Sequence, residues 1–279
     1  MDHPENGVDD CRRSKFKFGF RPLNSQVLEH EKMMKTEAMR IISEGSKRDL
    51  HVRLLGAIAF QTRCPKFSFL TQRLNRILSD IDFAAYSTES PRISGMMREL
   101  GYEDQPMVTA LWGDRRTIWD NKSNGLHVDI FLNKLEMNHD ISFQNRLGIH
   151  PFTIPLEEML LEKMQIVHLE EKDIVDTTML LREHDVGQTG PETIDARYVA
   201  KLLSNDWGFY YTCTTNLRKV SSRLEAYNEL SENDRSDVNA KVEKLLQAIE
   251  EQPKTLGWKM RAKVGTSKKW YRDVEEVRR

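Results

Sequence analysis

The stretch SDIDFAAY at residues 79–86 is the strongest indication of the fold of this chain. Its apolar residues predict a buried strand over residues 80–86, with two carboxylates near its start. Residues i and i+2 of a strand project from the same face, so Asp80 and Asp82 are expected on one side and Ile81 in the core. Adjacent carboxylates repel each other, and a divalent cation held between them relieves that repulsion. The alternative is a solvated strand end that binds nothing.

A second apolar stretch, HVDIF at residues 127–131, contains a third carboxylate. Asp129 stands among apolar neighbours, and an acid is rarely placed in a buried strand without a partner. If this strand neighbours the first, Asp80, Asp82 and Asp129 converge on one oxygen-rich site of the two-metal type. Such a site suits phosphoryl or nucleotidyl transfer, because two metal ions clamp the attacking and the leaving oxygens.

Together with a strand at residues 51–55 that ends at Gly56-Ala57, these motifs resemble the DNA polymerase β-type nucleotidyltransferase superfamily. The likeness is nearest to bacterial and archaeal nucleotidyltransferase-like proteins of the abortive-infection and toxin–antitoxin kind. A helical stretch with Lys163, followed by Asp173 and Asp176, resembles the Lys-then-Asp motif of those toxins. The resemblance covers residues 50–185.

The resemblance implies a catalytic site and a substrate. Asp80, Asp82 and Asp129 would be catalytic and would hold two Mg²⁺ ions, with Mn²⁺ as an alternative. The substrate would be a nucleoside triphosphate (NTP), whose nucleoside monophosphate is transferred to a hydroxyl group of an acceptor.

The resemblance also implies a nucleotide-binding set. Gly56 and Ala57 would cradle the triphosphate, Lys163 would contact phosphate, and Asp176 would orient Lys163 or the nucleotide base. The family usually has Gly-Gly or Gly-Ser at this turn, so Ala57 lacks the serine hydroxyl and the freedom of a second glycine. Lys163 also stands out by position, because it falls in the apolar stripe of its helix. A lysine there either meets an anion or extends its stem to the surface.

Cations are concentrated near the C-terminus, where Lys259, Arg261 and Lys263 alternate with Trp258 and Met260. The two-residue period predicts an extended strand with cations on one face and apolar side chains on the other. Such a strand could hold RNA phosphates, so the three cations are candidate nucleic-acid contacts. The alternative is a half-buried strand whose lysines only prevent edge pairing.

The composition is that of an ordinary globular protein. The chain has 279 residues, of which 39% are hydrophobic, and 42 basic against 43 acidic residues give a net charge of −1. This balance excludes a strongly basic nucleic-acid scaffold. The three cysteines form no CxxC pair, and neither a P-loop nor an HExxH motif is present. No apolar run is long enough for a bilayer and no secretory signal is visible, so we expect a cytoplasmic protein without membrane association.

The order of the elements predicts a mixed α/β (α+β) architecture. We expect a flexible basic arm at residues 1–23, a nucleotidyltransferase-fold domain with a mixed sheet at 24–152, a helical domain at 153–252 and a short basic β tail at 253–279. The expected elements are helices at 24–43 and 91–100, strands at 51–55, 80–86, 107–112, 115–119 and 126–132, and helices at 155–169, 172–184, 195–203 and 231–251.

The predicted function is Mg²⁺-dependent transfer of a nucleoside monophosphate from an NTP to a hydroxyl group of a macromolecule. The basic ends favour an RNA end, such as that of a tRNA, or a protein as the acceptor. The resemblance to toxins implies a defence role, with a cognate antitoxin as a partner. Two alternatives stay open: the same chemistry on a small molecule such as an antibiotic, and a nucleotide-binding module without turnover.

Overall fold

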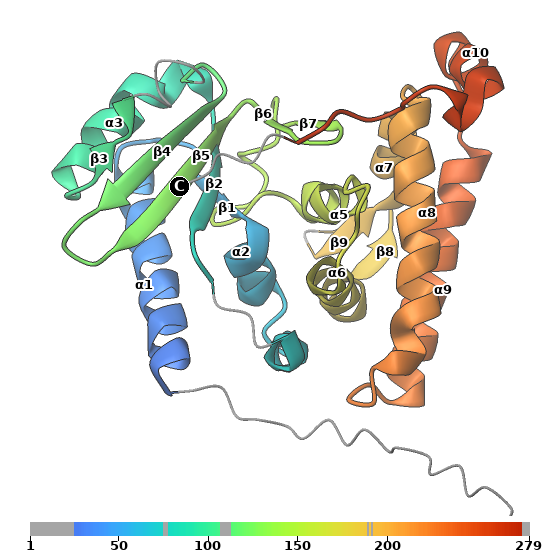
Figure 1. Ribbon diagram of the computed structural model, residues 1–279, viewed down its shortest axis with the longest axis horizontal. Helices are drawn as coiled ribbons and strands as arrows, with labels where there is room; N and C mark the ends of the chain where they lie inside the picture. The colour runs from blue at the N-terminus through green and yellow to red at the C-terminus, as the bar shows by residue number, and fades with distance from the viewer. Residues whose placement is uncertain (1–24, 75–77, 107–112, 189, 191, 275–279) are drawn as a thin grey trace, which may run out of the picture.

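The first part of the chain folds on a five-stranded mixed sheet in the order β1-β2-β5-β4-β3 (Figure 1). The structure is a computed structural model that describes residues 25–74, 78–106, 113–188, 190 and 192–274. The central strands β2 and β5 are parallel, and the other neighbours pair antiparallel. The strands are β1 (Arg53–Leu55), β2 (Ile81–Ala85), β3 (Glu103–Asp104), β4 (Arg116–Asn121) and β5 (Leu126–Leu132).

Helices flank this sheet and bury its apolar face. Met34, Ala38 and Ile41 follow helical spacing along the first helix and are completely buried. The second helix, α2, packs against β1 and β2 on the side that faces the helical part of the chain (Figure 1). The helices are α1 (Ser25–Lys47), α2 (Gly56–Arg63) and α3 (Ser90–Glu99), with 3₁₀ turns η1 (Ser68–Leu74) and η2 (Ser87–Glu89).

The second part of the chain is largely helical, which confirms the predicted change of character. Its helices are α5 (Leu156–Met164), α6 (Glu171–Glu183), α7 (Ala196–Leu203), α8 (Trp207–Arg223) and α9 (Glu232–Glu251), with a 3₁₀ turn η3 (Leu224–Ala226). The pair of β8 (Asp185–Gly187) and β9 (Thr193–Asp195) lies among these helices, whereas the pair of β6 (Lys134–Glu136) and β7 (Asp140–Ser142) follows β5 and belongs to the sheet part. Helix α5 is buried along its whole length and contacts α2, α6, α7 and α8. One apolar core therefore runs through both parts of the chain.

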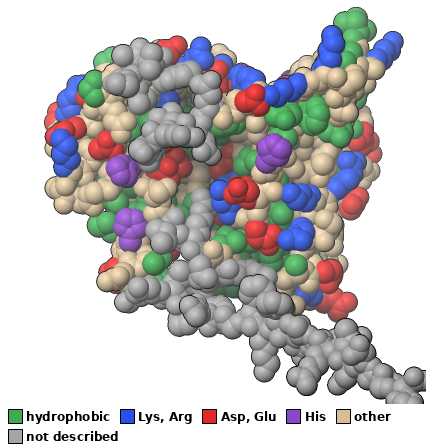
Figure 2. Space-filling model, viewed as in Figure 1, with side chains coloured by type: hydrophobic (Ala, Val, Ile, Leu, Met, Phe, Trp, Pro, Cys, Tyr) green, Lys and Arg blue, Asp and Glu red, His purple; other side chains and the backbone are tan. Residues whose placement is uncertain are grey.

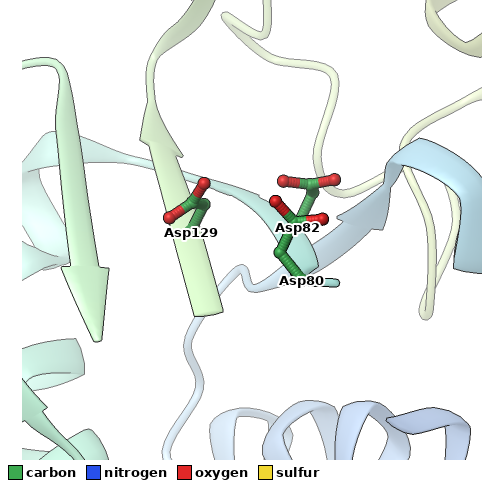
Figure 3. Close-up of side chains that lie close together, drawn as sticks. All are labelled: Asp80, Asp82 and Asp129. Carbon is green, nitrogen blue, oxygen red and sulfur yellow. The ribbon is translucent and has the colours of Figure 1, made fainter. Parts of the chain in front are cut away.

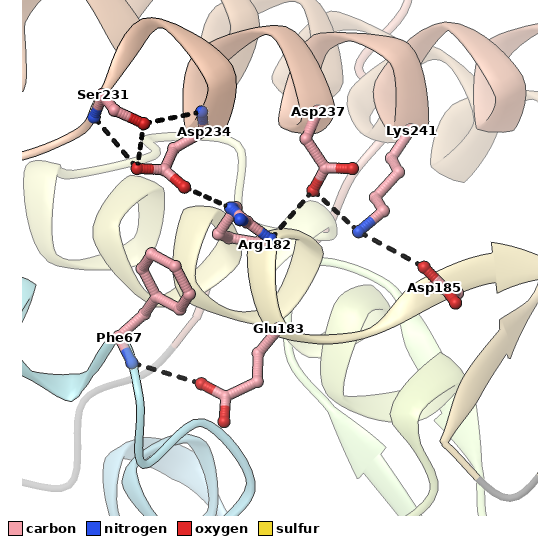
Figure 4. Close-up of polar contacts among 8 residues, drawn as sticks. All are labelled: Phe67, Arg182, Glu183, Asp185, Ser231, Asp234, Asp237 and Lys241. Carbon is pink, nitrogen blue, oxygen red and sulfur yellow. Dashed lines mark hydrogen bonds and ion pairs between the residues drawn. The ribbon is translucent and has the colours of Figure 1, made fainter.

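Polar contacts at the end of α6 fasten the helical part to the sheet part (Figure 4). The Arg182 guanidinium donates to Asp234 of α9 at 2.6 Å and lies 3.3 Å from Asp237. The neighbouring Glu183 accepts a hydrogen bond from the backbone N–H of Phe67 at 3.2 Å. Helix α6 thus connects α9 with the segment that follows α2.

Helix α8 was not among the predicted helices. Its sequence begins WGFYYTCTT, and aromatic and β-branched residues favour strands. The helix begins where the Asp206 side chain accepts from the Phe209 N–H at 3.0 Å. It buries Phe209, Cys213 and Leu217, and it packs against α5 and α9. Tertiary packing therefore outweighs the local strand preference.

The predicted basic β tail is wrong, because residues Leu256–Val264 form helix α10. Thr255 accepts from the Trp258 N–H at 3.3 Å, and Gly265 ends the helix with a φ of +58°. A threonine N-cap and a C-terminal glycine are ordinary helix boundaries. These boundary signals outweigh the two-residue apolar period. The helix projects from the body, with apolar and basic side chains at its surface (Figure 2).

As a consequence, Lys259, Arg261 and Lys263 do not share one face. The Arg261 guanidinium stacks 4.9 Å from the Trp207 ring and donates to the carbonyl of Gly265 at 2.6 Å. Lys259 and Lys263 are exposed and lie one helical turn apart. Arg261 therefore holds α10 in place, and of the three cations only Lys259 and Lys263 are free of such contacts with α8 and the helix end in the part of the chain that the structure describes.

Some predictions fall outside the described residues. These are the basic arm at 1–23, the strand at 107–112 and the tail beyond residue 274. Within the described ranges, no helix combines the length and the apolar character that a bilayer crossing requires.

Candidate functional site

Three carboxylates meet on one face of the sheet (Figure 3). Asp82 of β2 and Asp129 of β5 are partners in the parallel register, and Asp80 directly precedes β2. In-register neighbours project to the same face, which leaves Ile81 and Val128 on the opposite, completely buried face. One oxygen from each carboxylate lies within 4.8 Å of the others. The predicted convergence of the three acids is therefore confirmed.

The donor set fits a hard divalent cation such as Mg²⁺ or Mn²⁺. Such ions prefer carboxylate oxygens, and two of the three carboxylates lie on neighbouring strands that hold them in place. Gly56 makes room for this cluster, because a Cβ at that position would lie 2.5 Å from Oδ2 of Asp82. Its φ of +69° also favours glycine. The cluster could therefore bind a metal ion.

Negative charges crowd around Asp82. Burial, followed by the charges of Asp80, Asp129 and Glu162, raises the pKa of Asp82 well above its ordinary value, and Arg116 offsets this only in part. Each of these carboxylates makes it harder for Asp82 to ionise. A bound cation would remove this repulsion.

Arg116 of β4 is a site residue that the sequence pattern did not reveal. Its guanidinium pairs with Asp129, which is 1% exposed, and stacks 4.9 Å from the Phe131 ring. The pair forms because Arg116 opposes Phe131 in the β4–β5 register and therefore lies diagonal to Asp129. Only the register reveals this contact. Arg116 orients the Asp129 carboxylate.

The turn at Gly56 is occupied by a carboxylate. The Gly56 N–H, at the start of α2, donates to both oxygens of Glu162 on α5, at 3.2 and 3.3 Å. Burial raises the pKa of Glu162 to about 7. A helix N-terminus attracts anions, and Glu162 supplies one from within the chain. Ala57 follows in α2, partly buried against the core. Nothing in the helix pattern distinguishes Glu162 from the other acids of α5.

Lys163 is buried in an ion-pair cluster. Its Nζ lies 2.9 Å from Asp176 and 3.4 Å from Asp173, and it stacks 5.1 Å from the Phe60 ring. Burial alone would lower the pKa of Lys163, but the neighbouring carboxylates, Asp176 above all, raise it. The anions that Lys163 meets are therefore carboxylates of the same chain, and Asp176 lies close enough to orient it.

An open cleft of about 570 Å³ lies beside the carboxylates. Asp82 and Glu162 line it, and Lys163 does not belong to its lining. Lys172 is the one lysine or arginine among the described residues that line it. The remaining lining residues are Leu55, Phe131, Leu135, Met137, Asn138, Gln165, Ile166, His168, Glu170, Asp173, Tyr271, Asp273 and Val274.

Comparison of the chain with protein-family models, with curated proteins and with solved structures finds no match.

Lys163→Met should destabilise the protein strongly, because it leaves Asp173 and Asp176 buried without their counter-charge. We expect the free energy of unfolding, measured with urea, to fall by about 3–5 kcal/mol. Adding Asp176→Asn to Lys163→Met should recover part of this loss. Lys172→Met, at a half-exposed position, is the control and should change stability by less than about 1 kcal/mol. Equal effects of the two lysine variants would contradict the buried ion-pair cluster.

The raised pKa of Glu162 should make folding stability depend on pH. The folded protein binds this proton at a pKa of about 7 and the unfolded chain at 4.5, so the stabilisation is complete below pH 4.5 and is lost as the pH rises through 7. Over this pH range the free energy of unfolding of wild type should fall by up to about 3 kcal/mol, and that of Glu162→Gln should not show this fall. Urea denaturation across the range measures the difference.

The control for this experiment is Glu243→Gln, on the exposed surface of α9. It should show the same pH dependence as wild type. A Glu162→Gln variant that follows the wild-type pH dependence would show that Glu162 ionises normally.

Proposed function

We propose that this protein is a metal-dependent nucleotidyltransferase that transfers a nucleoside monophosphate from an NTP to a hydroxyl group of an acceptor. The observation that supports this proposal is the convergence of Asp80, Asp82 and Asp129 beside an open cleft of about 570 Å³. Pockets of roughly 300–1,000 Å³ hold small-molecule ligands. The resemblance of the acid motifs to DNA polymerase β-type enzymes agrees with this assignment.

In this proposal the three aspartates hold divalent ions, Mg²⁺ or Mn²⁺. Bound ions would neutralise charge on the phosphates and stabilise the attacking and leaving oxygens. Arg116 keeps the Asp129 carboxylate in position, as its ion pair indicates. The acceptor oxygen bonds to the α-phosphorus, the bond to pyrophosphate breaks, and the hydroxyl proton leaves to a base.

The triphosphate would lie against Gly56 and the first turn of α2. There a phosphate oxygen would replace the Glu162 carboxyl group as the acceptor of the Gly56 N–H, since a helix N-terminus attracts anions. We propose that Lys172 contacts the phosphate, because Lys163 does not line the cleft. Lys172 lines the cleft and pairs with Glu170 at 2.6 Å.

The charges of the cleft disfavour the phosphate backbone of an RNA acceptor inside it. Its described lining contains five carboxylates and a single lysine, Lys172, and carboxylates repel the phosphates of RNA. An RNA acceptor would need its contacts elsewhere, for example at Lys259 and Lys263 of α10. We therefore propose a small hydroxylated molecule as the second candidate acceptor, beside an RNA end or a protein hydroxyl.

Asp82→Asn tests the metal site and the chemistry together. Without metal at neutral pH, this variant should be more stable than wild type, because it removes one of the repelling charges. Mg²⁺ or Mn²⁺ should raise the melting temperature of wild type and not that of the variant. Transfer from labelled NTP to RNA, to protein or to small hydroxylated acceptors should be lost in the variant.

The control is Asp185→Asn, an exposed acid of β8 far along the chain from the cluster. It should leave the metal effect and the transfer as in wild type. Full transfer by Asp82→Asn, or a metal effect of the same size in Asp82→Asn, would overturn the proposed site.

A further inference from the structure

The last described residues cross from the helical part back to the sheet part. Residues 268–274 run extended from α10 and the 3₁₀ turn η4 (Gly265–Ser267) to the β6–β7 pair (Figure 1). We call this segment the C-terminal strap. The Arg272 N–H donates to the Asn138 carbonyl at 3.1 Å, and the Asn138 amide donates to the Arg272 carbonyl at 2.8 Å. Arg272 also pairs with Asp140 of β7.

A second anchor joins the strap to α8. The Trp270 indole N–H donates to Oγ1 of Thr212 at 3.1 Å, and its ring lies 5.1 Å from the Tyr211 ring. A Cβ at Gly208 would lie 2.4 Å from the Trp270 carbonyl oxygen, so this close approach requires glycine. The anchors at Trp270 and Arg272 hold the strap from both sides.

Tyr271, between the two anchors, lines the cleft beside the carboxylates. Tyr271 and Asp273 line the cleft, whereas Trp270 and Arg272 make the anchors. The Tyr271 ring meets His168 edge to face at 6.5 Å. The apolar residues that line the cleft together with Tyr271 include Leu135, Met137, Ile166 and Val274.

We propose that the C-terminal strap forms a wall of the nucleotide site and that Tyr271 contacts the nucleobase of the bound NTP. This inference rests on the proposed function. The triphosphate belongs near Gly56 and the aspartates, which leaves the aromatic and apolar lining for the base. A planar base gains affinity from such surfaces by burial and stacking. Asp273, in the same lining, disfavours phosphate there.

Calorimetry with Mg²⁺ and each of the four NTPs tests this assignment, with tripolyphosphate as the probe that lacks a base. Tyr271→Ala should weaken binding of the preferred NTP by about tenfold or more, the usual scale for a lost stacking contact. Its binding of tripolyphosphate should equal that of wild type. Tyr271→Phe keeps the ring and should bind NTP like wild type. Melting temperatures verify that both variants are folded.

The outcomes separate the two proposals. Equal NTP affinity in Tyr271→Ala and wild type would overturn the assignment of Tyr271, even where Asp82→Asn abolishes binding. An equal loss of NTP and tripolyphosphate affinity in Tyr271→Ala would also overturn it, because the residue would then act on the phosphates. Failure of wild type to bind any NTP or tripolyphosphate would overturn the proposed function itself.

Discussion

Repulsion between carboxylates on two adjacent parallel strands is the constraint on which the site depends. Asp82 and Asp129 are paired in register, so the central strand pair of the sheet holds both side chains on the same face. Asp80 adds a third charge, and the Arg116 guanidinium of β4 offsets the repulsion in part. Such an arrangement costs stability unless a ligand offsets it. Binding of a divalent cation is the simplest reason for the chain to keep these acids together.

Hydrogen bonds connect the sheet part and the helical part of the chain around the cleft. Leu54 of β1 exchanges backbone hydrogen bonds with the segment before α5, donating to Phe152 at 2.8 Å and accepting from Ile154 at 2.9 Å. Glu162 and Glu183 add contacts from α5 and α6 to the segments around α2. The strap closes the opposite side through Arg272. The cleft is thus a built feature of one continuous core, with residues from five separate segments in its lining.

The hydrophobic periodicity of the sequence predicts many of the helices and strands. The contacts between separate elements depend on how those elements pair, which periodicity does not show. The apolar stretches around Asp82 and Asp129 form buried strands, and a short apolar run of this kind is a local signal. The contacts of Arg116 and Glu162 depend on which residues of separate elements face each other, and no local pattern contains that information. Lys163 stands out in the sequence because it interrupts an apolar stripe, but the anions that it meets are Asp173 and Asp176 of the next helix, which no local pattern identifies. At α10, cap residues outweighed an alternating pattern, so the predicted strand is a helix.

The central claim is that the three aspartates bind metal ions in a nucleotide site. It is tested most directly by X-ray diffraction from crystals of the full chain grown with Mn²⁺ and a non-hydrolysable NTP, with data collected at the manganese absorption edge. We expect anomalous peaks in contact with carboxylate oxygens of Asp80, Asp82 and Asp129, with the triphosphate accepting a hydrogen bond from the Gly56 N–H. Bound nucleotide without an anomalous peak at these carboxylates would contradict it.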